Sequence, residues 1–274
     1  MNKRIKLGNL PIYLALGIGA ITMLFPFVWM ILTAFKTNAE AMQIPPVIFP
    51  SEWNLDAFKQ AMESLPFGKL YINTGLMIFF RIVCAVAFSS MAGYAFAKIE
   101  FPFKKVLFSL VLIQMMLPSQ IFLIPQYQML AKVGLTESIF GLVFPGLVSA
   151  FGTFFLRQIY MGIPNEIAEA AQLDGCTRWQ TFTKVMLPLT LPGIVALAIF
   201  TAVFAYGDLM WPLIVNTDLN KMTLASGLST LNGQFVTNFP VLMAGSLLAM
   251  APMLILYIIF QRHFIEGVAM TGGK

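Results

Sequence analysis

Long apolar blocks separated by short polar segments limit this chain to very few folds. Six blocks hold enough apolar residues to cross a hydrocarbon core about 30 Å thick as helices that rise about 1.5 Å per residue. Charged residues make up 11% of the 274 residues and hydrophobic residues 58%, whereas about 25% of residues are charged in a soluble domain. So few charges cannot coat a soluble surface. The sequence therefore predicts an all-α integral membrane protein with six transmembrane helices.

The predicted spans follow one another along the chain, and a polar segment, 157–188, separates the fourth from the fifth. No internal repeat or low-complexity tract is evident, so residues 1–274 are expected to form a single transmembrane domain. Between the first two spans, Leu55, Phe58 and Met62 have helical spacing and predict one short amphipathic helix. The spans cover about residues 10–35, 71–97, 106–130, 138–156, 189–215 and 241–261.

The placement of Lys and Arg predicts the orientation of the chain, so the net charge of +5 is topology information rather than a nucleic-acid footprint. With the N-terminus inside, eleven of the 17 basic residues fall in inner segments and five in outer loops, and Arg81 lies within a span. This bias places both termini and segment 157–188 in the cytoplasm. The inner residues are Lys3, Arg4, Lys6, Lys98, Lys104, Lys105, Arg157, Arg178, Lys184, Arg262 and Lys274. The outer residues are Lys36, Lys59, Lys69, Lys132 and Lys221.

Segment 157–188 is predicted to form a short helix, a turn and a second short helix. Pro164 suits a first helical turn because it has no amide hydrogen to leave unpaired. Gly175 stands where that helix would stop, and glycine tolerates the left-handed geometry of such a stop. Thr177, with Gln180 three residues later, predicts a capping box at the start of the second helix, which Pro188 closes. On these residues alone, the hairpin either binds a partner or merely joins two spans.

The sequence holds no evident catalytic or metal-binding constellation. A phosphate-binding loop needs Gly-x-x-x-x-Gly-Lys-Ser/Thr, but the nearest approach, 267–272, is followed by Gly273 where the Lys belongs. His263 is the single histidine, and Cys84 and Cys176 are expected at different membrane depths rather than in a disulfide. We therefore expect a transport subunit that is not an enzyme and binds no cofactor or metal itself. If ATP drives transport, a separate subunit must hydrolyse it.

A motif covers much of segment 157–188: Glu169-Ala170-Ala171, Asp174-Gly175, Phe182, Leu187-Pro188 and Pro192. In residue type and spacing it resembles the EAA loop of the permease subunits of binding-protein-dependent ABC importers. Cys176 departs from the pattern, which usually has a small residue such as alanine there. The resemblance implies a cytoplasmic coupling helix that docks onto a separate ATPase. The implied coupling residues are Glu169, Ala170, Ala171, Asp174, Gly175, Phe182, Leu187 and Pro188.

Three further features are similar to the carbohydrate-uptake branch of that family, and most similar to the shorter permease subunit of maltose-type systems. They are Asn73-Thr74, Trp211-Pro212-Leu213 and the ending Gln261-Arg262-His263-Phe264 with Gly267. Members usually carry a polar residue, often Asn, just ahead of the acid before that Trp-Pro, whereas Gly207 precedes Asp208 here. The branch implies half of a sugar translocation pathway in a bacterial or archaeal cytoplasmic membrane. It also implies a second, non-identical permease subunit, two ATPase subunits that hold ATP and Mg, and an extracytoplasmic solute-binding protein.

Four residues near or inside the spans are candidates for the translocation path: Arg81, Tyr206, Asp208 and Trp211. An arginine within a span costs about 2.5–3.5 kcal/mol on insertion scales unless it is paired or hydrated. Counted from the inner ends, Arg81 and Asp208 lie at similar heights, which would allow them to pair. In the alternative interpretation, Arg81 only pairs with a carboxylate or snorkels, while the two aromatic residues anchor a helix at the interface.

Other functions fit parts of the pattern. A permease for glycerol phosphate, amino acids or peptides would carry the same motif. A secondary transporter is expected to show acids for ion coupling inside its spans, and here Asp208, near a rim, is the one candidate. A membrane enzyme would need catalytic residues that the sequence does not show.

Overall fold

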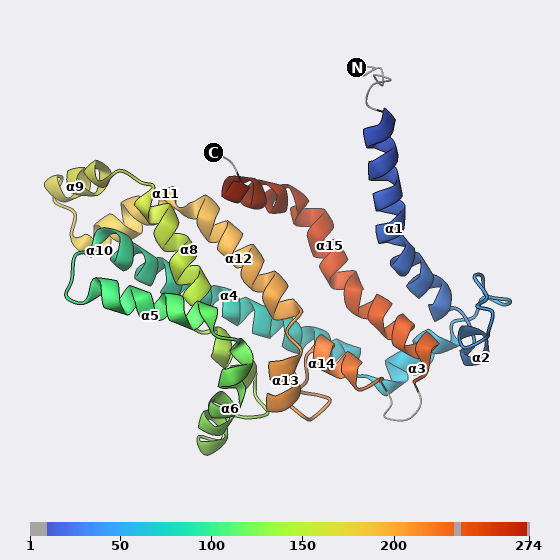
Figure 1. The fold of residues 1–274 in the computed structure, drawn as a ribbon. Helices are drawn as coiled ribbons and strands as arrows, with labels where there is room; N and C mark the ends of the chain where they lie inside the picture. Colours follow the sequence, from blue (N-terminus) through green and yellow to red (C-terminus); the bar gives the residue numbers. More distant parts are fainter. Residues whose placement is uncertain (1–9, 233–236, 273–274) are drawn as a thin grey trace. The chain divides into compact units, whose positions relative to one another are not determined.

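The computed structural model describes residues 10–232 and 237–272, and within these ranges helices are the only regular secondary structure (Figure 1). The chain divides into two compact units. One comprises residues 1–66 and 227–253, and the other comprises residues 67–226 and 254–274. The single transmembrane domain expected from the sequence therefore stays a prediction.

In the first unit, α1 (Leu10–Ala34) runs on through Pro26 and is followed by α2 (Asn38–Ala41) and α3 (Asp56–Ser64). The predicted amphipathic helix is confirmed as α3, which buries Ala57 and Ala61. Beyond α1, the Nζ atom of Lys36 donates a 2.5 Å hydrogen bond to the Val47 carbonyl and lies 4.5 Å from the centre of the Trp29 ring. These contacts allow a lysine to be buried, since its charge has both a hydrogen-bond acceptor and an aromatic face.

The second unit is organised around α4 (Phe67–Lys98), which packs along α8 (Ala150–Met161) and α12 (Leu191–Tyr206). At one end of this bundle a hydrophobic cluster gathers Tyr94, Leu156, Tyr160, Phe182, Met186 and Leu197. Small residues allow the close approach: a Cβ on Gly93 would lie 2.9 Å from the backbone nitrogen of Arg157. The remaining short helices of this unit branch from its three long ones.

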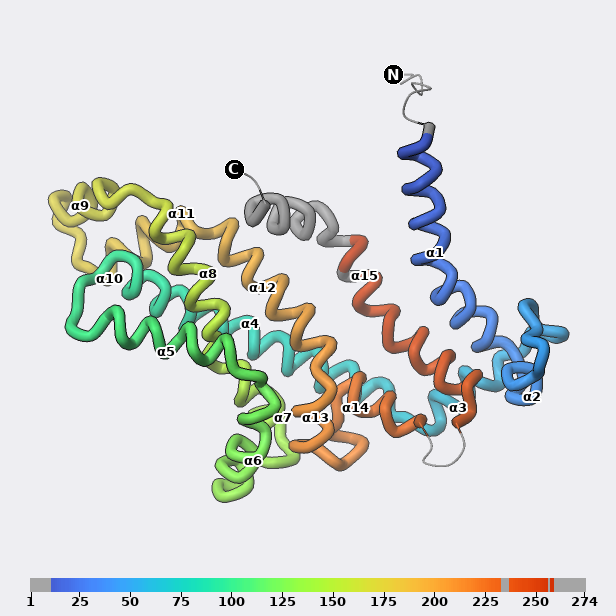
Figure 2. The backbone as a smooth tube through the Cα atoms, in the orientation of Figure 1, coloured from blue at the N-terminus to red at the C-terminus, as the bar shows by residue number. Residues whose placement is uncertain are grey.

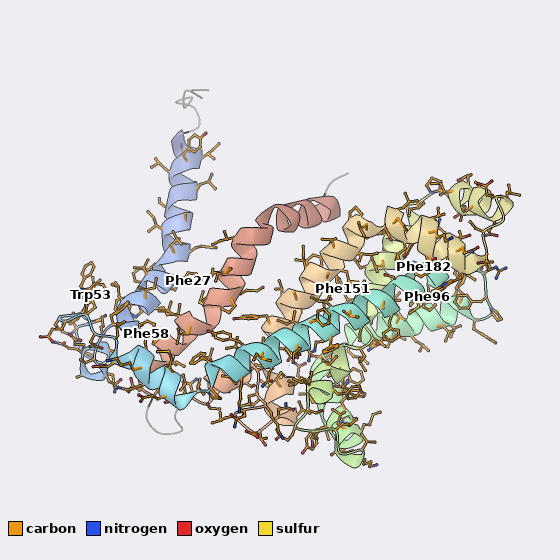
Figure 3. The ribbon with its side chains drawn as sticks, turned by 180° about the vertical axis from the view of Figure 1, so that it is seen from behind. Phe27, Trp53, Phe58, Phe96, Phe151 and Phe182 are labelled. Atoms are coloured by element: carbon orange, nitrogen blue, oxygen red, sulfur yellow. The ribbon has the colours of Figure 1, made fainter. Side chains whose placement is uncertain are left out.

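Aromatic side chains fill contacts within each unit (Figure 3). In the second unit, the ring centroid of Phe182 lies 5.1 Å from that of Tyr94, and Phe151 meets Phe200 edge-on at 6.0 Å. In the first, Phe58 lies 5.4 Å from Phe35. Offset and edge-to-face pairs at such distances add about 0.5–1.5 kcal/mol each beyond burial.

The prediction of one continuous third span, 106–130, is wrong. The chain forms α5 (Lys104–Met116), the short η2 (Ser119–Phe122) and α6 (Leu123–Lys132), with a bend of 101° between the two halves (Figure 2). The break falls at Pro118, which has no amide hydrogen and disfavours helical geometry in the residue before it. Leu117 accordingly takes an extended conformation, with ψ 134°. The apolar pattern was correct, but it does not report the direction of the helix axis.

The fourth and fifth predicted spans, 138–156 and 189–215, are broken as well. The fourth consists of α7 (Ile139–Val143), η3 (Phe144–Gly146) and α8, bent by 47°, and α8 runs past the predicted end. The fifth consists of α12 and α13 (Met210–Val215), and the residues between them are not helical (Figure 2). The predicted second span, 71–97, lies within the longer α4.

The sixth predicted span, 241–261, lies within α15 (Phe239–Gly272). The side chains of the ending motif at 261–267 lie outside the described residues. Among the helices described, α1 and α4 are long and apolar enough to cross a membrane singly. Three bent pairs qualify if each counts as one span, and the apolar part of α15, Phe239–Ile255, is shorter. The total of six spans stays a prediction.

Candidate functional site

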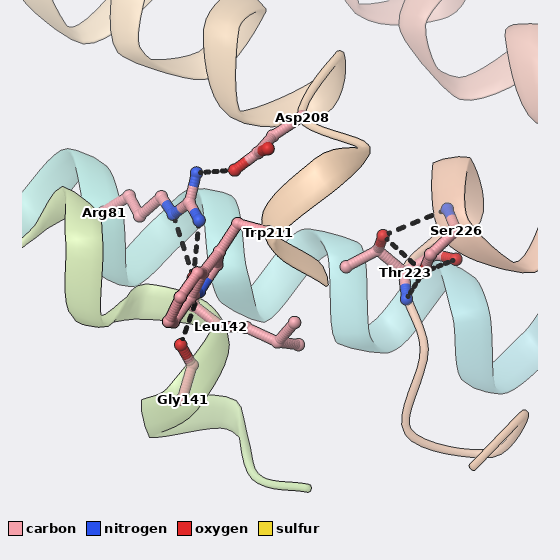
Figure 4. Close-up of polar contacts among 7 residues, drawn as sticks. All are labelled: Arg81, Gly141, Leu142, Asp208, Trp211, Thr223 and Ser226. Atoms are coloured by element: carbon pink, nitrogen blue, oxygen red, sulfur yellow. Dashed lines mark hydrogen bonds and ion pairs between the residues drawn. The ribbon is translucent and has the colours of Figure 1, made fainter. Parts of the chain in front are cut away.

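A buried ion pair lies at the centre of the second unit (Figure 4). Nη1 of Arg81 donates to Oδ2 of Asp208 at 2.8 Å, and Nε and Nη2 donate to the Leu142 carbonyl at 3.1 and 2.6 Å. The Arg81 side chain is 8% exposed and that of Asp208 is 25% exposed. The pairing expected from their similar heights is therefore present. It offsets the cost of an arginine within an apolar span.

The broken helices supply the acceptors of this site. The carbonyls of Gly141 and Leu142 lie in the last turn of α7, where carbonyl groups have no intrahelical partner. Pro145, four residues after Gly141 and three after Leu142, has no N–H to donate to either. Instead, Nε1 of Trp211 donates to the Gly141 carbonyl at 2.8 Å, and Arg81 takes the Leu142 carbonyl. Asp208 lies in the gap between α12 and α13.

Tight packing holds Arg81 in this position. A Cβ on Gly146 would lie 2.8 Å from both Cγ and Cδ of Arg81, so the absence of a side chain there makes room for the guanidinium stem. Trp211 is 3% exposed and packs with Met77 and Val215 in a second hydrophobic cluster. The charged pair is therefore fixed from the α4, α7 and α13 sides.

Two adjoining pockets open beside the pair. One, of about 640 Å³, is lined by Arg81 and Asp208, and the other, of about 230 Å³, is lined by Asp208 and Trp211. Their remaining polar lining is uncharged and comprises Gln114, Ser119, Gln120, Gln126, Ser149 and Thr201. Phe151, Phe200 and Phe204 add aromatic rings to the larger pocket. The site can therefore offer amide, hydroxyl and carboxylate groups beside apolar faces.

Three of the four candidate path residues are brought together, and the fourth is not. Arg81, Asp208 and Trp211 line these pockets, whereas Tyr206, the last residue of α12, lines neither. The sequence interpretation missed the polar residues of the third block, such as Gln114 and Ser119. Their signal was Pro118, which breaks the helix between them.

The outer end of α13 is tied down by a carboxylate in the preceding loop. Glu137 accepts hydrogen bonds from the backbone nitrogen and hydroxyl of Thr217, at 2.7 and 2.6 Å, and from the backbone nitrogen of Asp218 at 3.4 Å. Burial alone would raise the pKa of Glu137, but these hydrogen bonds, with Lys221 nearby, hold it below the usual value. The loop after α13 is thereby fixed to the loop before α7.

The polar segment 157–188 forms the predicted helix, turn and helix. Its first helix, α9, spans Asn165–Leu173. The backbone nitrogen of Cys176 donates to the Ala171 carbonyl at 3.0 Å, and that of Gly175 donates to the Gln172 carbonyl at 3.1 Å. These are the two bonds of a Schellman stop. Gly175 has φ +87°, so the predicted left-handed glycine is confirmed.

The chain after the turn begins with the predicted capping box between Thr177 and Gln180. It continues as α10 (Arg178–Gln180), the π-helix η4 (Thr181–Met186) and α11 (Leu187–Leu189), which contains Leu187 and Pro188. Phe182 is 5% exposed and packs in the cluster with Tyr94 and Ala168. This second half of the segment therefore anchors α9 to the bundle.

One face of α9 is held and the other is free of contacts that bury it. Ala168 and Ala171 are each 8% exposed, whereas Glu169, Ala170 and Asp174 are exposed and Leu173 is 89% exposed. At its start, Oδ1 of Asn165 accepts a 2.6 Å hydrogen bond from Nζ of Lys98. The candidate coupling residues thus fall into an anchoring group and an exposed group.

The broken apolar helices, the polar pocket between them and the helical loop at one end define a polytopic membrane transport protein. Residues 85–269 match the family described as the binding-protein-dependent transport system inner membrane component. This match covers more than half of the chain, and the chain belongs to that family. It is a permease subunit of an ABC importer, a transport component of the inner membrane rather than an enzyme, and it works with other transporter subunits.

Two relatives and one solved structure place the chain more closely. It is 35% identical over 258 residues to the arabinooligosaccharides transport system permease protein AraQ of Halalkalibacterium halodurans, covering 93% of this chain and 92% of the relative. It is 28% identical over 264 residues to the sn-glycerol-3-phosphate transport system permease protein UgpE of Pectobacterium atrosepticum, covering 93% and 94%. A bacterial ABC transporter involved in the import of the acidic polysaccharide alginate shares the fold. That likeness has a TM-score of 0.79 at 20% identity and covers 96% of this chain and 100% of that chain. The resemblance and the fold class expected from the sequence are confirmed.

Proposed function

We propose that this chain forms half of the translocation pathway for a neutral oligosaccharide, with the pockets beside Arg81 and Asp208 on the path. The observation that carries the proposal is the charge of these pockets. Their lining contains one cation and one carboxylate, and these neutralise each other at 2.8 Å. The rest of the polar lining consists of amides and hydroxyls, which exchange hydrogen bonds with sugar hydroxyls without demanding a charge.

Sugar transport has a rival in glycerol phosphate, which the UgpE relative is named for. A phosphate monoester carries about 1.5 to 2 negative charges near neutral pH, and it would need an uncommitted cation. Arg81 already uses three of its nitrogens on Asp208 and Leu142. The higher identity to the arabinooligosaccharide relative supports the same choice.

The coupling part of the proposal assigns α9 and its turn to docking. The exposed face of α9, with Glu169, Ala170 and Asp174, binds a separate ATPase subunit in the cytoplasm, while Phe182 and the α11 residues pass the motion to α12. ATP and Mg are held by that subunit. The complete importer contains this chain, a second non-identical permease, two ATPase subunits and an extracytoplasmic solute-binding protein, with both termini of this chain in the cytoplasm.

The assay that tests the function uses the importer purified through a tag on this chain, with its binding protein added. Arabino-oligosaccharides or maltose-type sugars should stimulate ATP hydrolysis, and sn-glycerol-3-phosphate should not. Glu169→Lys should leave the permease pair intact but remove the stimulation, since it reverses a charge on the exposed face of α9. Stimulation by glycerol phosphate alone would replace the substrate class. Full stimulation in Glu169→Lys would refute the docking role.

Orientation is tested separately, with native Cys84 and Cys176 replaced. A single cysteine at Thr271 should resist a membrane-impermeant thiol reagent in intact cells, and one at Ser51 should react. The reverse pattern would invert the proposed topology. Residues 1–9, which carry the N-terminal part of that prediction, lie outside the described residues.

A further inference from the structure

A second, basic pocket of about 680 Å³ lies where α4, α5 and α8 meet. None of its lining residues lines the transport pockets or belongs to α9. Its volume is within the range of about 300–1,000 Å³ that is usual for ligand sites. Its lining comprises Phe96, Glu100, Phe101, Phe103, Lys104, Lys105, Val106, Phe108, Ser109 and Arg157.

Three cations and one carboxylate line this pocket, so its net charge is positive. Nζ of Lys104 lies 2.9 Å from Oε1 of Glu100, which neutralises one cation. Lys105 and Arg157 have no ion-pair partner among the residues that the structure describes. The pocket therefore keeps two cations that no carboxylate of this chain balances.

The Arg157 guanidinium is fixed rather than mobile. Its Nε donates to the Phe96 carbonyl at 3.2 Å, and its central carbon lies 4.1 Å from the centre of the Phe108 ring. In the described part of the chain, Nη1 and Nη2 make no hydrogen bond. Two donors of a planar fork are thus held in place and left unused, which is the arrangement that binds phosphate oxygens.

Exposed apolar side chains continue from the pocket along α5. Phe103 is 77% exposed and Val106 58%, and the helix then runs apolar to Met116. The lysines at the start of α5 therefore stand at the boundary between polar and apolar surface. A ligand that matches both features carries an anionic phosphate and a hydrocarbon chain.

We propose that this pocket binds an anionic phospholipid, with its phosphate between Lys105 and Arg157 and its acyl chains along α5. The placement in the inner leaflet rests on the proposed orientation, which puts the start of α5 on the cytoplasmic side. That leaflet carries anionic lipid, and basic pockets between membrane helices on that side are suited to such headgroups. A bound lipid fills the space between three helices that support α9, so it stabilises the bundle beneath the docking helix.

The test uses the complete importer in nanodiscs made from equal amounts of phosphatidylglycerol and phosphatidylcholine. Native mass spectrometry of the released complex counts each retained lipid. Phosphatidylglycerol should be enriched over phosphatidylcholine, and Lys105→Gln should reduce that enrichment about fivefold, the effect of one basic residue near an anionic surface. Arg157→Gln should reduce it at least as much. Lys105 is exposed and its side chain has no described partner, so its substitution leaves the fold intact.

Lys132→Gln is the matched control, because it removes one exposed lysine at the end of α6. Equal retention of the two lipids, or an equal loss with Lys132→Gln, would overturn the proposal. Millimolar inorganic phosphate distinguishes the sources of the anion. Lipid retained in its presence supports the phospholipid, whereas displacement shows a site for free phosphate and refutes the lipid. The measurement needs no transported solute, so its outcome is separate from that of the sugar proposal.

Discussion

Removing one partner of the Arg81–Asp208 pair has a cost that the structure bounds from both sides. Arg81→Leu leaves the Asp208 carboxylate without its cation and the Leu142 carbonyl without its donor. Breaking a buried pair costs about 3–5 kcal/mol, and an unsatisfied acceptor costs about 1–3 kcal/mol. Because the Asp208 side chain is 25% exposed, water screens part of its charge. We therefore expect a loss near the lower end, about 3 kcal/mol.

Asp208→Asn should cost less, about 1–2 kcal/mol. The neutral amide oxygen can still accept from Nη1, and Arg81 keeps both of its bonds to the Leu142 carbonyl. The double variant, Arg81→Leu with Asp208→Asn, buries no unpaired charge. It should be more stable than Arg81→Leu alone, with a coupling energy of about 1–3 kcal/mol.

Equilibrium unfolding of the purified subunit pair in mixed micelles measures all four members of this cycle, and uptake in cells reports function. A charge-swapped variant, Arg81→Asp with Asp208→Arg, is a further control. An aspartate at position 81 has no N–H to offer the Leu142 carbonyl, so the swap should restore the charge balance but not the wild-type stability. Strict additivity of the two single changes, or full rescue by the swap, would refute this account of the site.

Three other predictions concern single positions. Gly146→Ala should lower stability by about 1–3 kcal/mol through overpacking against Arg81, whereas Gly75→Ala, whose Cβ would meet nothing within 4 Å, should be neutral in the same unfolding assay. Gly175→Val should cost about 1–2 kcal/mol because φ is +87°, and reduce ATPase co-purification more than Gly175→Asn does; equal effects of the two would contradict the left-handed requirement. The lowered pKa of Glu137 means that its stabilising effect is complete above its unfolded pKa, near 4.5, and is lost as pH falls through the lower folded value. Glu137→Gln should abolish that acid-dependent loss in thermal melts, and an unchanged pH profile would disprove it.

Local signals in the sequence were sufficient for segment 157–188. The stop at Gly175 and the capping box at Thr177 depend on backbone geometry and on side chains a few residues apart, so they can be predicted without knowledge of the fold. Membrane class and the positions of the apolar blocks also follow from composition and length alone. The pairing of Arg81 with Asp208 was accessible because an unpaired arginine within a span is costly.

What the sequence could not supply was the path of the helix axis through each apolar block. Hydropathy is the same for a straight span and for one bent by 101° at Pro118. The Leu142 carbonyl was also beyond prediction, since every residue carries such a group and only tertiary packing shows which one meets Arg81. Both gaps have one origin: the breaks become visible as a site only when separate helices are brought together.

The connection between the docking helix and the ion pair is short and largely rigid. The anchored half of segment 157–188 leads through α11 directly into α12, with a bend of 75° at Thr190. The hydroxyl of Thr190, which is fully buried, donates to the Leu187 carbonyl at 2.9 Å and to the Tyr160 hydroxyl at 3.3 Å, which fixes the bend. From there α12 runs for 16 residues, about 24 Å, to the gap that holds Asp208. A displacement of α9 against its ATPase would therefore reach Asp208 as a movement of one helix. Because the guanidinium of Arg81 is held independently by the Leu142 carbonyl, such a movement would change the distance between Arg81 and Asp208 rather than carry both along. The ion pair thus stands where an element moved by the loop meets one held by the bundle, which is what a two-state coupling between the ATPase and the pocket requires.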